Sequence, residues 1–453
     1  MTDATAMPAE TPKHRHASSL LEADARTKAR NAAERRFQMY GIAAIAIGLV
    51  FLVILLGSII RNGIPAFTQT YMTVQVELLA DKLDKKGNRD PADLKKVSTF
   101  GYAPLIDNAI FAKVQSLGIE TPFEKPKDMR ALVSASAPAQ LRDMVLANPD
   151  LIGTTIDFKV LNSSRVDGYM KGRVTRDSVA RDKNIDAEHF DIVDAMVDQG
   201  SLARVFNLAF ITGADASESR PEQAGIGVSM IGSFFMMLVV LGLSLPLGVA
   251  ASIYLEEFAP KNRFTDLIEV NISNLAAVPS IVFGILGLAV FIQFMHLPQS
   301  APLVGGLVLT LMTLPTIIIS TRASLKAVPP SIRDAALGIG ASKMQSVFHH
   351  VLPLAAPGIL TGTIIGLAQA LGETAPLLLI GMVGYIASNY PGGVAEGFLS
   401  PNSSMPAQIY EWSKRADPAY YERAWGGIVI LLLFLMTMNI IAILLRRRFE
   451  RRW

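Results

Sequence analysis

The chain contains no cysteine, which excludes disulfide bonds, thiolate metal sites and cysteine nucleophiles. Its six histidines show no spacing typical of metal ligands. It also lacks a G-x-x-x-x-G-K-S/T motif, the loop that cradles nucleotide phosphates, so any ATP that drives this protein must be hydrolysed by a partner. The net charge of +3 over 453 residues does not indicate a nucleic-acid partner.

Apolar residues, in contrast, are abundant: they make up 51% of the chain and gather in long runs. A helix needs about 20 of them to cross a bilayer. Six runs meet this length: 41–60, 228–255, 272–295, 302–321, 354–386 and 425–445. The fifth run is too long for one straight crossing, so we expect a bend within it. We therefore predict an all-α polytopic membrane protein with six transmembrane helices.

The first apolar run is typical of a membrane span and not of a cleaved signal. Residues 1–38 form a polar, basic tail, which we expect to be disordered and cytoplasmic. The run that follows is longer than a secretory apolar region and has no small-residue cleavage site behind it. We place the first transmembrane helix at 39–60.

The placement of lysine and arginine predicts the orientation of the spans. Basic residues are concentrated in 1–38 and in 447–453, so both termini are expected in the cytoplasm of a bacterial inner-membrane protein. This arrangement requires an even number of spans. The loop 296–301 has no lysine or arginine and is expected outside, whereas 322–353 has four and is expected inside. Aromatic residues mark the outer end of the last span: Tyr420, Tyr421 and Trp425.

Between the first two spans lies a polar segment, 61–225, which is long enough to have its own core. Its patterns predict a small extracytoplasmic α+β domain. We expect helices at 105–117, 129–146 and 187–197, and strands at 73–79, 154–161 and 205–211. A docking surface, a sensor and an inert insertion are all compatible with these residues. The remaining core, 226–446, contains the loop 322–353.

The loop 329–353 predicts two short amphipathic helices joined at Gly340. Pro329 and Pro330 end the preceding helix, and Ser331 is placed to cap the next one, with Asp334 three residues on. One apolar face of the first helix has helical spacing: Ile332, Ala335, Ala336 and Ile339. Gly338 and Gly340 supply the stop and the turn.

A second capping box, Ser342 with Gln345, begins the second helix. Its apolar face consists of Met344, Val347, Phe348 and Val351. Two interpretations follow. The helices either lie on lipid, or their alanines and glycines let another protein approach closely.

The amino-acid sequence of this loop favours the second interpretation. The segment Asp334-Ala335-Ala336-x-x-x-Gly340, ending in Leu352-Pro353, resembles the EAA loop of ABC-type importer permeases. In that family the loop is a coupling helix that sits in a groove of the ATPase subunit. Asp334 replaces the usual glutamate, and His350 stands where the pattern usually has an apolar residue. The resemblance assigns the coupling residues as Asp334, Ala335, Ala336 and Gly340.

Four further segments extend the resemblance: 245–258, 279–291, 309–342 and 372–379. With the motifs IYLEE and GETAPLL, they are similar to phosphate-transport permeases of the PstA type over roughly 225–445. This resemblance implies a type I ABC importer permease fold that translocates inorganic phosphate. It implies four kinds of partner: a second permease subunit like PstC, a pair of ATPase subunits that bind the ATP, a periplasmic phosphate-binding protein, and membrane lipid. The chain itself is expected to bind no cofactor and no metal.

One ionisable side chain, Glu373, lies inside an apolar run, where a carboxyl group is costly and by default indicates a functional site. Pro376 moves Ala375 away from helical geometry, so we expect the break in the fifth run at 372–376. Two functional roles are open: pairing with a basic residue that closes the path, or accepting a hydrogen bond from protonated phosphate. The structural alternative is a carboxylate that stabilises a helix start.

Hydroxyl groups complete the predicted path, since no lysine or arginine occurs between 354 and 386. Gln369 stands where relatives commonly have an arginine, four residues before this glutamate. We assign Thr374, Thr316 and Ser320 to the translocation path with Glu373, together with backbone N–H groups or the partner permease. Further candidates are Thr313, Thr361 and Thr363, although a buried threonine in a membrane helix more often bonds its own backbone.

Three alternatives differ in cargo or in class. In the first, the chain is a permease for another oxyanion, such as phosphonate, sulfate or molybdate. In the second, it is a membrane receptor that senses a ligand through 61–225. The five later spans and the coupling loop argue against a receptor. An intramembrane enzyme would need paired carboxylates, or histidine with aspartate, inside the spans, where Glu373 stands alone. Regulatory signalling alongside transport stays open.

Overall fold

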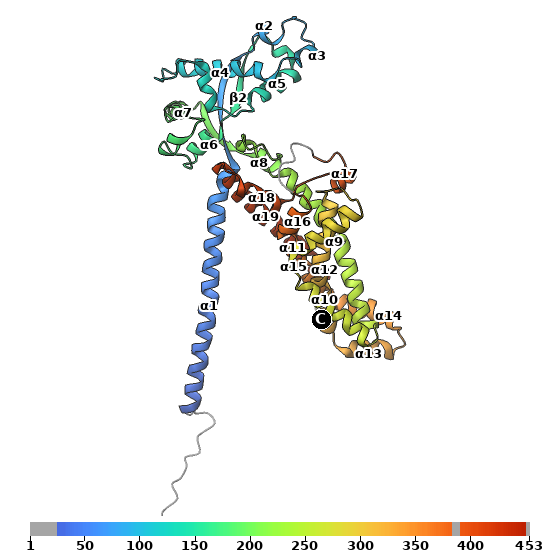
Figure 1. The fold of residues 1–453 in the computed structure, drawn as a ribbon. Helices are drawn as coiled ribbons and strands as arrows, with labels where there is room; N and C mark the ends of the chain where they lie inside the picture. Colours follow the sequence, from blue (N-terminus) through green and yellow to red (C-terminus); the bar gives the residue numbers. More distant parts are fainter. Residues whose placement is uncertain (1–24, 383–389, 450–453) are drawn as a thin grey trace, which may run out of the picture. The chain divides into compact units, whose positions relative to one another are not determined.

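The computed structural model describes residues 25–382 and 390–449, and it separates into two units, 1–58 and 59–453. The first unit is the greater part of helix α1 (Ala25–Gly63), drawn in blue in Figure 1. Its apolar side chains are exposed along the predicted span 39–60, as expected of a helix surrounded by lipid. The predicted disordered tail is partly wrong, because α1 already begins at Ala25. The segment 25–38 is rich in Ala, Arg and Glu, which favour a helix that continues into the span. Residues 1–24 lie outside the described residues.

The inserted domain, residues 61–225, is built on a three-stranded antiparallel sheet of order β2-β1-β3. The strands are β1 (Thr68–Glu77), β2 (Thr155–Leu161) and β3 (Leu202–Phe206). In the register of the sheet, Val74 pairs with Phe158 and Thr70 with Arg204. Alternate residues of β1 are buried at its C-terminal half, which gives the sheet one face against a core. The α+β prediction is confirmed.

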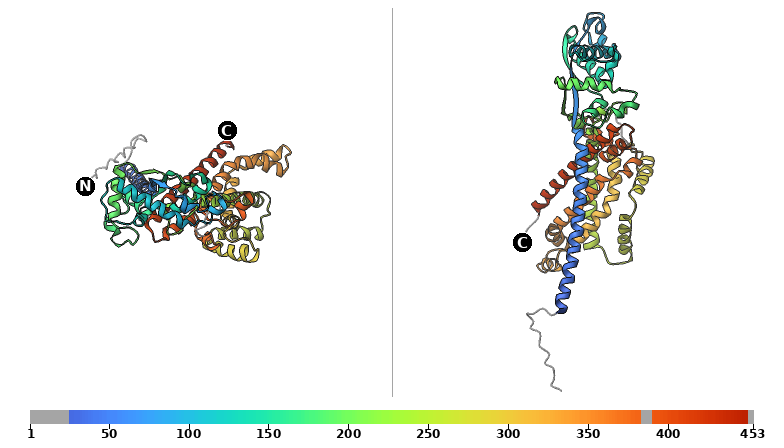
Figure 2. Two further views of the ribbon diagram at one scale, coloured as in Figure 1. Left: turned by 90° about the horizontal axis from the view of Figure 1, so that it is seen from above. Right: turned by 90° about the vertical axis from the view of Figure 1, so that its left-hand side faces the viewer.

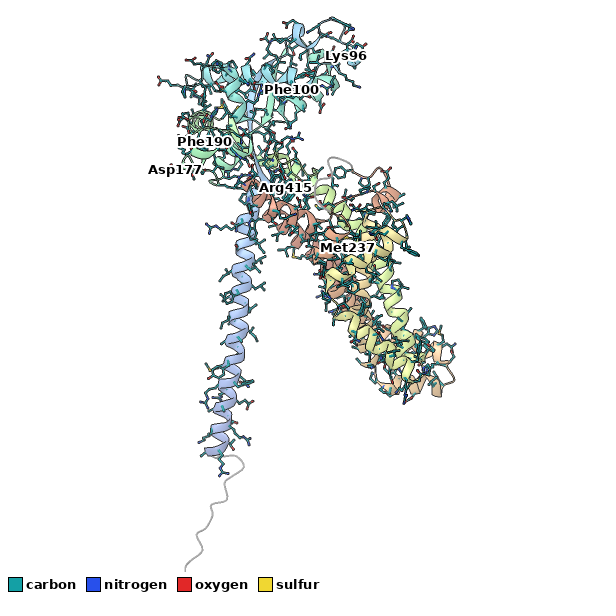
Figure 3. The ribbon with its side chains drawn as sticks, viewed as in Figure 1. Lys96, Phe100, Asp177, Phe190, Met237 and Arg415 are labelled. Carbon is teal, nitrogen blue, oxygen red and sulfur yellow. The ribbon has the colours of Figure 1, made fainter. Side chains whose placement is uncertain are left out.

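Helices cover this sheet and supply most of its core, in which Phe190 is fully buried (Figure 3). They are α2 (Ala80–Leu83), α3 (Pro91–Leu94), α4 (Thr99–Ser116), α5 (Ala137–Ala147), α6 (Ser164–Met170) and α7 (Glu188–Asp198). Helix α8 (Leu208–Thr212) follows the last strand and contributes Phe210 to a separate apolar core. Short 3-10 turns occur at Ile64–Phe67, Pro126–Leu132, Pro149–Leu151, Asp177–Arg181 and Pro221–Gln223.

Two predicted elements of this domain are wrong in part. The helix expected at 129–146 is divided, because the buried residues Ser134 and Ser136 bond each other between the turn Pro126–Leu132 and α5. The strand expected at 205–211 contains only the end of β3. Asn207 then caps α8 by accepting the backbone N–H of Phe210, which turns the chain into a helix.

The remaining elements are almost entirely helical. They are α9 (Gly227–Ile253), α10 (Arg263–Ala276), α11 (Ser280–Gly287), α12 (Pro302–Lys326), α13 (Pro330–Gly338), α14 (Lys343–Ser346), α15 (Leu352–Gly372), α16 (Ala375–Leu379), α17 (Val394–Leu399), α18 (Met405–Lys414) and α19 (Pro418–Phe449). Three π-helical turns extend them: Tyr254–Phe258, Leu288–Phe294 and Val347–Val351. Among the described residues, five helices are long and apolar enough to cross a membrane, or six if one bent pair counts as a span.

The bent pair corrects the third predicted span, 272–295. The run divides into α10 and the segment Ser280–Phe294, which meet at an angle of 100°. Pro279 has no backbone N–H and disfavours helical geometry in the residue before it, so α10 ends at Ala276. Composition alone did not reveal this break.

The helices α9, α12 and α15 pack side by side, and their green, yellow and orange ribbons lie together in both views of Figure 2. Small residues allow the close approach: Gly306 lies against Val239, and Gly248 against Ile317. Met237 of α9 belongs to this second core (Figure 3), which is separate from the core of the inserted domain.

Ion pairs join the inserted domain to the start of α19. The Lys171 Nζ lies 2.6 Å from Glu422 Oε1, and the Arg173 Nε lies 3.1 Å from Glu422 Oε2. Arg165 pairs with Asp417, the residue before α19. The domain and the last apolar helix are therefore connected by charges as well as by the chain.

The connection before α19 adds a second set of bonds. Arg415 (Figure 3) pairs with Asp215 at 2.6 Å, and the indole of Trp412 donates to the same carboxylate at 2.8 Å. Tyr420 is fully buried and donates its hydroxyl to the carbonyl oxygen of Ser217 at 2.8 Å. Tyr421 and Trp425 keep exposed surface, so Tyr420 differs from a side chain at a membrane interface.

Candidate coupling surface and translocation path

The predicted coupling residues lie on and just after α13. Asp334 and Ala335 are exposed, while Ala336 is 4% exposed and faces inward. Gly340 follows the helix with φ +91°, a left-handed conformation that side chains rarely adopt. The structure thus places the four residues together on one short helix and its turn.

The local pattern of α13 differs from the prediction in two respects. Pro329, and not Ser331, occupies the N-cap position, because the proline pair sets the extended-to-helical transition itself. The predicted apolar face is only partly buried: Ile332 and Ala336 point inward, whereas Ile339 is 85% exposed. Leu337 is also exposed, which leaves apolar surface open on this helix.

The capping box of Ser342 and Gln345 is confirmed. The backbone N–H of Gln345 donates to the Ser342 hydroxyl, and the backbone N–H of Ser342 donates to the Gln345 side chain at 2.8 Å. The expected second short helix is wrong, however, because α14 continues through the turn Val347–Val351 into α15 without a break. The helix from this cap is therefore the start of the fifth apolar span.

Arg333, next to Asp334, has a set of contacts that sequence reasoning missed. Its guanidinium lies 2.6 Å from the Glu257 carboxylate and donates to two carbonyl oxygens, those of Leu325 at 2.9 Å and Val328 at 2.8 Å. Glu257 lies in the π-helical turn that ends α9, and its side chain is 7% exposed. The only indication of this ion pair in the sequence was the presence of two adjacent acidic residues, Glu256 and Glu257, at the end of an apolar run.

The neighbouring acid, Glu256, has different partners. Arg322 of α12 lies 3.3 Å from Glu256 and 2.6 Å from Glu269 of α10. Lys326 lies 3.6 Å from the same Glu256 carboxylate. This second network connects three helices of the core and does not include α13.

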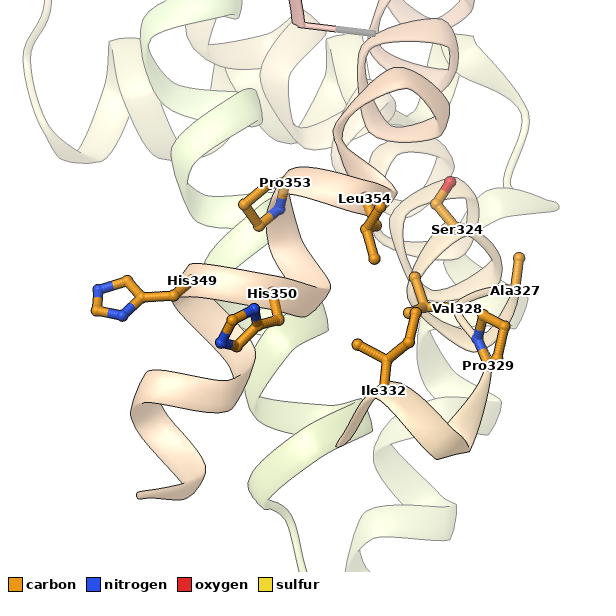
Figure 4. A pocket seen from close by; sticks show the side chains of 9 residues that line it. All are labelled: Ser324, Ala327, Val328, Pro329, Ile332, His349, His350, Pro353 and Leu354. Carbon is orange, nitrogen blue, oxygen red and sulfur yellow. The ribbon is translucent and has the colours of Figure 1, made fainter. Parts of the chain in front are cut away.

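A cavity of about 570 Å³ lies beside α13 (Figure 4). Figure 4 shows Ile332 from α13 facing Leu354 at the start of α15, with Val328 between them. The exposed rings of His349 and His350 stand at its edge. His350, where the family pattern has an apolar residue, is thus at a surface, where a polar ring is tolerated.

The predicted break in the fifth span is confirmed. Helix α15 ends at Gly372, Glu373 has an extended backbone, and α16 begins at Ala375. The carbonyl of Thr374 accepts the backbone N–H groups of Leu377 and Leu378, both at 3.1 Å. Within the described residues, the half-buried Glu373 forms no ion pair with a lysine or arginine. The end of the predicted run, 383–386, lies outside the described residues.

The hydroxyl groups of the path bond mainly to their own helices. Thr313 donates to Leu309 O at 3.0 Å, Thr363 to Ile359 O at 2.9 Å, and Ser320 to Ile317 O at 3.1 Å. Thr361 also donates to its own helix and accepts a bond of 3.1 Å from Arg446 of α19. Thr316 and Thr374 are half-buried. Most of these hydroxyl groups already donate their hydrogen to a backbone carbonyl. Toward an incoming anion they therefore present lone pairs, and not hydrogen-bond donors.

Known proteins resemble the apolar core of this chain. The model of the binding-protein-dependent transport system inner membrane component matches residues 244–453. The phosphate transport system permease protein PstA 1 of Mycobacterium tuberculosis (strain ATCC 25618 / H37Rv) is 31% identical over 228 residues, which are 50% of this chain and 71% of that protein. The chain belongs to the PstA family of permeases. It is accordingly a multi-pass membrane protein of the transport class, and the PstA family core is its helical part.

Other relatives align to a similar extent. The PstA of Haemophilus influenzae is 28% identical over 48% of this chain and 74% of its own length. The probable ABC transporter permease YqgI of Bacillus subtilis (strain 168) is 29% identical over 48% of this chain and 76% of its own. A separate model, a domain of unknown function (DUF3333), matches residues 24–180. The inserted domain therefore lies outside the shared PstA core.

One solved structure is a distant neighbour. The inward-facing MetNI methionine ABC transporter covers 50% of this chain and 95% of its own, at 16% identity and a TM-score of 0.37. A likeness at this level carries no argument about the site.

Proposed function

We propose that this chain is one membrane-spanning permease subunit of an ATP-driven importer that moves inorganic phosphate across the bacterial inner membrane. The observation that carries the proposal is the similarity to phosphate transport system permeases over the helical core. Transport, and not catalysis, is the role of this subunit. ATP is bound and hydrolysed by a partner.

The partners follow from this role. A second, PstC-like permease completes the path, a pair of ATPase subunits supplies energy, and a periplasmic binding protein delivers phosphate. The exposed side of α13 supports contact with an ATPase, since Asp334 and Ala335 are exposed and small side chains permit close approach. Gly340 turns the chain sharply after α13, which keeps this helix short.

The orientation follows from the same scheme. Both termini and α13 lie in the cytoplasm, and the inserted domain lies outside. The basic residues near the chain ends support this arrangement, because lysine and arginine favour the cytoplasmic side.

The broken fifth span is proposed as part of the path. Glu373 sits at a break between two helices, with Thr374 beside it. The lack of a basic partner for Glu373 among the described residues favours hydrogen bonding to protonated phosphate over closure by an ion pair. Thr316 and Ser320 of α12 are proposed to lie along the same route.

The deciding experiment is ATP-dependent uptake of labelled phosphate in a strain that lacks this chain, with and without the gene restored. Restored uptake that unlabelled sulfate, molybdate and phosphonate do not inhibit supports the proposal. If the protein is stable in the membrane but phosphate uptake is not restored, the assignment of phosphate as the cargo is overturned. Restored phosphate uptake that one competitor inhibits would show that the path also accepts that oxyanion.

Glu373 is tested in the same assay. We expect Glu373→Gln to reduce the rate of phosphate uptake at unchanged amounts of protein in the membrane. Glu188→Gln, in an exposed position of α7, is the control and is expected to transport like the unaltered chain. Uptake by Glu373→Gln at the control rate would leave Glu373 with only a structural role.

A further inference from the structure

Arg333 donates to three acceptor groups from one side chain: one carboxylate and two backbone carbonyls. Its Nε and Nη2 atoms donate to the Glu257 carboxylate at 3.1 and 2.6 Å. Its Nη1 donates to Val328 O at 2.8 Å, and its Nη2 donates to Leu325 O at 2.9 Å. The planar fork of an arginine suits such a set, whereas a lysine offers one charged point.

These acceptors belong to two different spans. Leu325 lies in the last turn of α12 and Val328 two residues after its end, where carbonyl oxygens are open to donors from outside the helix. Glu257 lies in the turn Tyr254–Phe258, which extends α9. Arg333 itself is on α13, so one side chain connects the proposed coupling helix to both spans.

Few other side chains attach α13 to the core. Ala336 is the one buried residue of this helix, and Ile332 packs against the small apolar cluster beside it. The remaining polar side chains of α13, Ser331 and Asp334, are exposed. Movement of α13 therefore reaches α9 through Arg333 and a small apolar contact, and it reaches α12 through Arg333 and the short connection 327–329.

The spans that receive this contact pack as a pair. Gly306 of α12 lies against Val239 of α9, and Gly248 of α9 lies against Ile317 of α12. A displacement applied at their shared end is carried along both helices, because close-packed helices move together and do not deform independently.

We infer that Arg333 is a positioning residue that transmits movement of the coupling helix to α9 and α12 through Glu257. This inference rests on the proposed function, since it assumes that an ATPase moves α13. Arg333 touches neither the cargo nor the nucleotide. It fixes the angle between the helix that receives the force and the spans that open the path.

The network of Glu256 provides a matched control. Glu256 is the residue before Glu257, is similarly shielded, and pairs with Arg322 of α12 at 3.3 Å. Its partners lie on α12 and do not include α13. The variants Glu256→Gln and Glu257→Gln therefore remove equal charge from the same turn, but only the second breaks the link to α13.

The experiment uses the complete transporter with its partner permease, ATPase subunits and binding protein, reconstituted in vesicles. Phosphate transported per ATP hydrolysed is measured for five chains: unaltered, Arg333→Gln, Arg333→Lys, Glu257→Gln and Glu256→Gln. We expect the ratio to fall about tenfold in Arg333→Gln and Glu257→Gln, while ATP hydrolysis continues. Glu256→Gln is expected to keep the ratio of the unaltered chain. Arg333→Lys is expected to resemble Arg333→Gln, because a lysine cannot reach all the acceptors.

A second readout does not depend on the cargo. Because the chain has no cysteine, spin labels can be placed at Leu247→Cys on α9 and Asp177→Cys in the inserted domain without first removing a native cysteine. ATP binding is expected to change the distance between the labels in the unaltered background and to leave it unchanged with Arg333→Gln.

The outcomes separate the two proposals. An unchanged transport ratio in Arg333→Gln, or an equal fall in Glu256→Gln, overturns the inference while phosphate import stands. If the unaltered chain carries no phosphate, the cargo proposal fails, and the label distance alone decides the role of Arg333. A distance that responds to ATP equally with and without Arg333 overturns the inference in either case.

Discussion

Lys171 of the inserted domain and Glu422 of α19 form an ion pair of 2.6 Å whose side chains are 2% and 6% exposed. Lys171 also pairs with Asp167 at 2.6 Å, and Asp167 accepts the backbone N–H of Thr70 in the central strand. A chain of buried polar contacts thus runs from the sheet to the last span. The inserted domain is not simply tethered by its two connections.

Breaking this pair is expected to destabilise the protein strongly. Lys171→Met removes the cation that the buried carboxylates of Asp167 and Glu422 share, and only Glu422 keeps a second cationic partner, Arg173. Breaking a buried ion pair typically costs about 3–5 kcal/mol in the free energy of unfolding. Lys86→Met is the control, since Lys86 is 66% exposed in its pair with Asp93, and exposed pairs contribute about 0–1 kcal/mol. Denaturant unfolding in detergent measures both variants. Equal losses in the two would contradict a buried junction.

The carboxyl of Glu222 is expected to make stability depend on pH. Burial raises the pKa of Glu222 above its ordinary value of 4.5, and the hydrogen bond from Ser134 opposes this. The charged groups that face it are Arg423, which lowers the pKa, and Asp417, which raises it.

The sign follows from proton binding. Between the unfolded and the raised folded pKa, the folded state binds more protons, so the free energy of unfolding falls as pH rises. The contribution is complete below about pH 4.5 and is lost through the folded pKa. Unfolding of Glu222→Gln across this range should lack that fall, whereas Glu218→Gln, an exposed neighbour, should retain it. Parallel pH profiles for the unaltered chain and Glu222→Gln would count against the prediction.

The packing of α9 on α12 is expected to exclude a methyl group at Gly306. A Cβ there would lie 2.5 Å from Val239 Cβ and 2.9 Å from Met236 O, so both helices must shift. We expect Gly306→Ala to lower the free energy of unfolding by about 1–3 kcal/mol. Gly242→Ala, on α9 with open space around it, should be neutral or slightly stabilising. Thermal unfolding compares the pair, and a neutral Gly306→Ala would argue against this contact.

Substitutions at Gly340 and Gly338 test whether α13 needs glycine for its backbone conformation or for the space around the residue. A Cβ meets nothing within 4 Å at either position, but only Gly340 has a positive φ. Gly340→Ala is therefore expected to cost about 1–2 kcal/mol in this turn and to weaken co-purification with the ATPase subunits. Gly338→Ala should leave co-purification intact. Equal binding by both variants would show that the left-handed turn is dispensable.

Much of the fold could be predicted because it depends on local patterns. The apolar runs gave the membrane helices, Pro376 marked the break after Gly372, and Ser342 with Gln345 marked a helix start. The α+β class of the inserted domain followed from alternating strands and helical stretches. Each of these signals lies within a few residues of its structural effect.

The parts that could not be predicted depend on distant partners. Arg333 and Glu257 are 76 residues apart in the chain, and Lys171 and Glu422 are 251 apart. A single sequence does not pair such charges. The bend at Pro279 was missed because the run is apolar on both sides of it. Ile339 looked like a core residue by its spacing but lies beyond the last turn of α13.

The order of strands in the inserted domain has a consequence for biogenesis. The central strand β1 follows α1 directly and is synthesised first, yet it pairs with both β2 and β3, and β3 lies just before α8 and α9. The sheet therefore cannot close until nearly the whole segment between the first two apolar helices has been made. If this segment crosses the membrane, it must cross before its sheet has formed. Formation of the sheet is then slow, because its strands pair over long distances in the sequence. Maturation of this permease then includes a folding step that the shared core does not require.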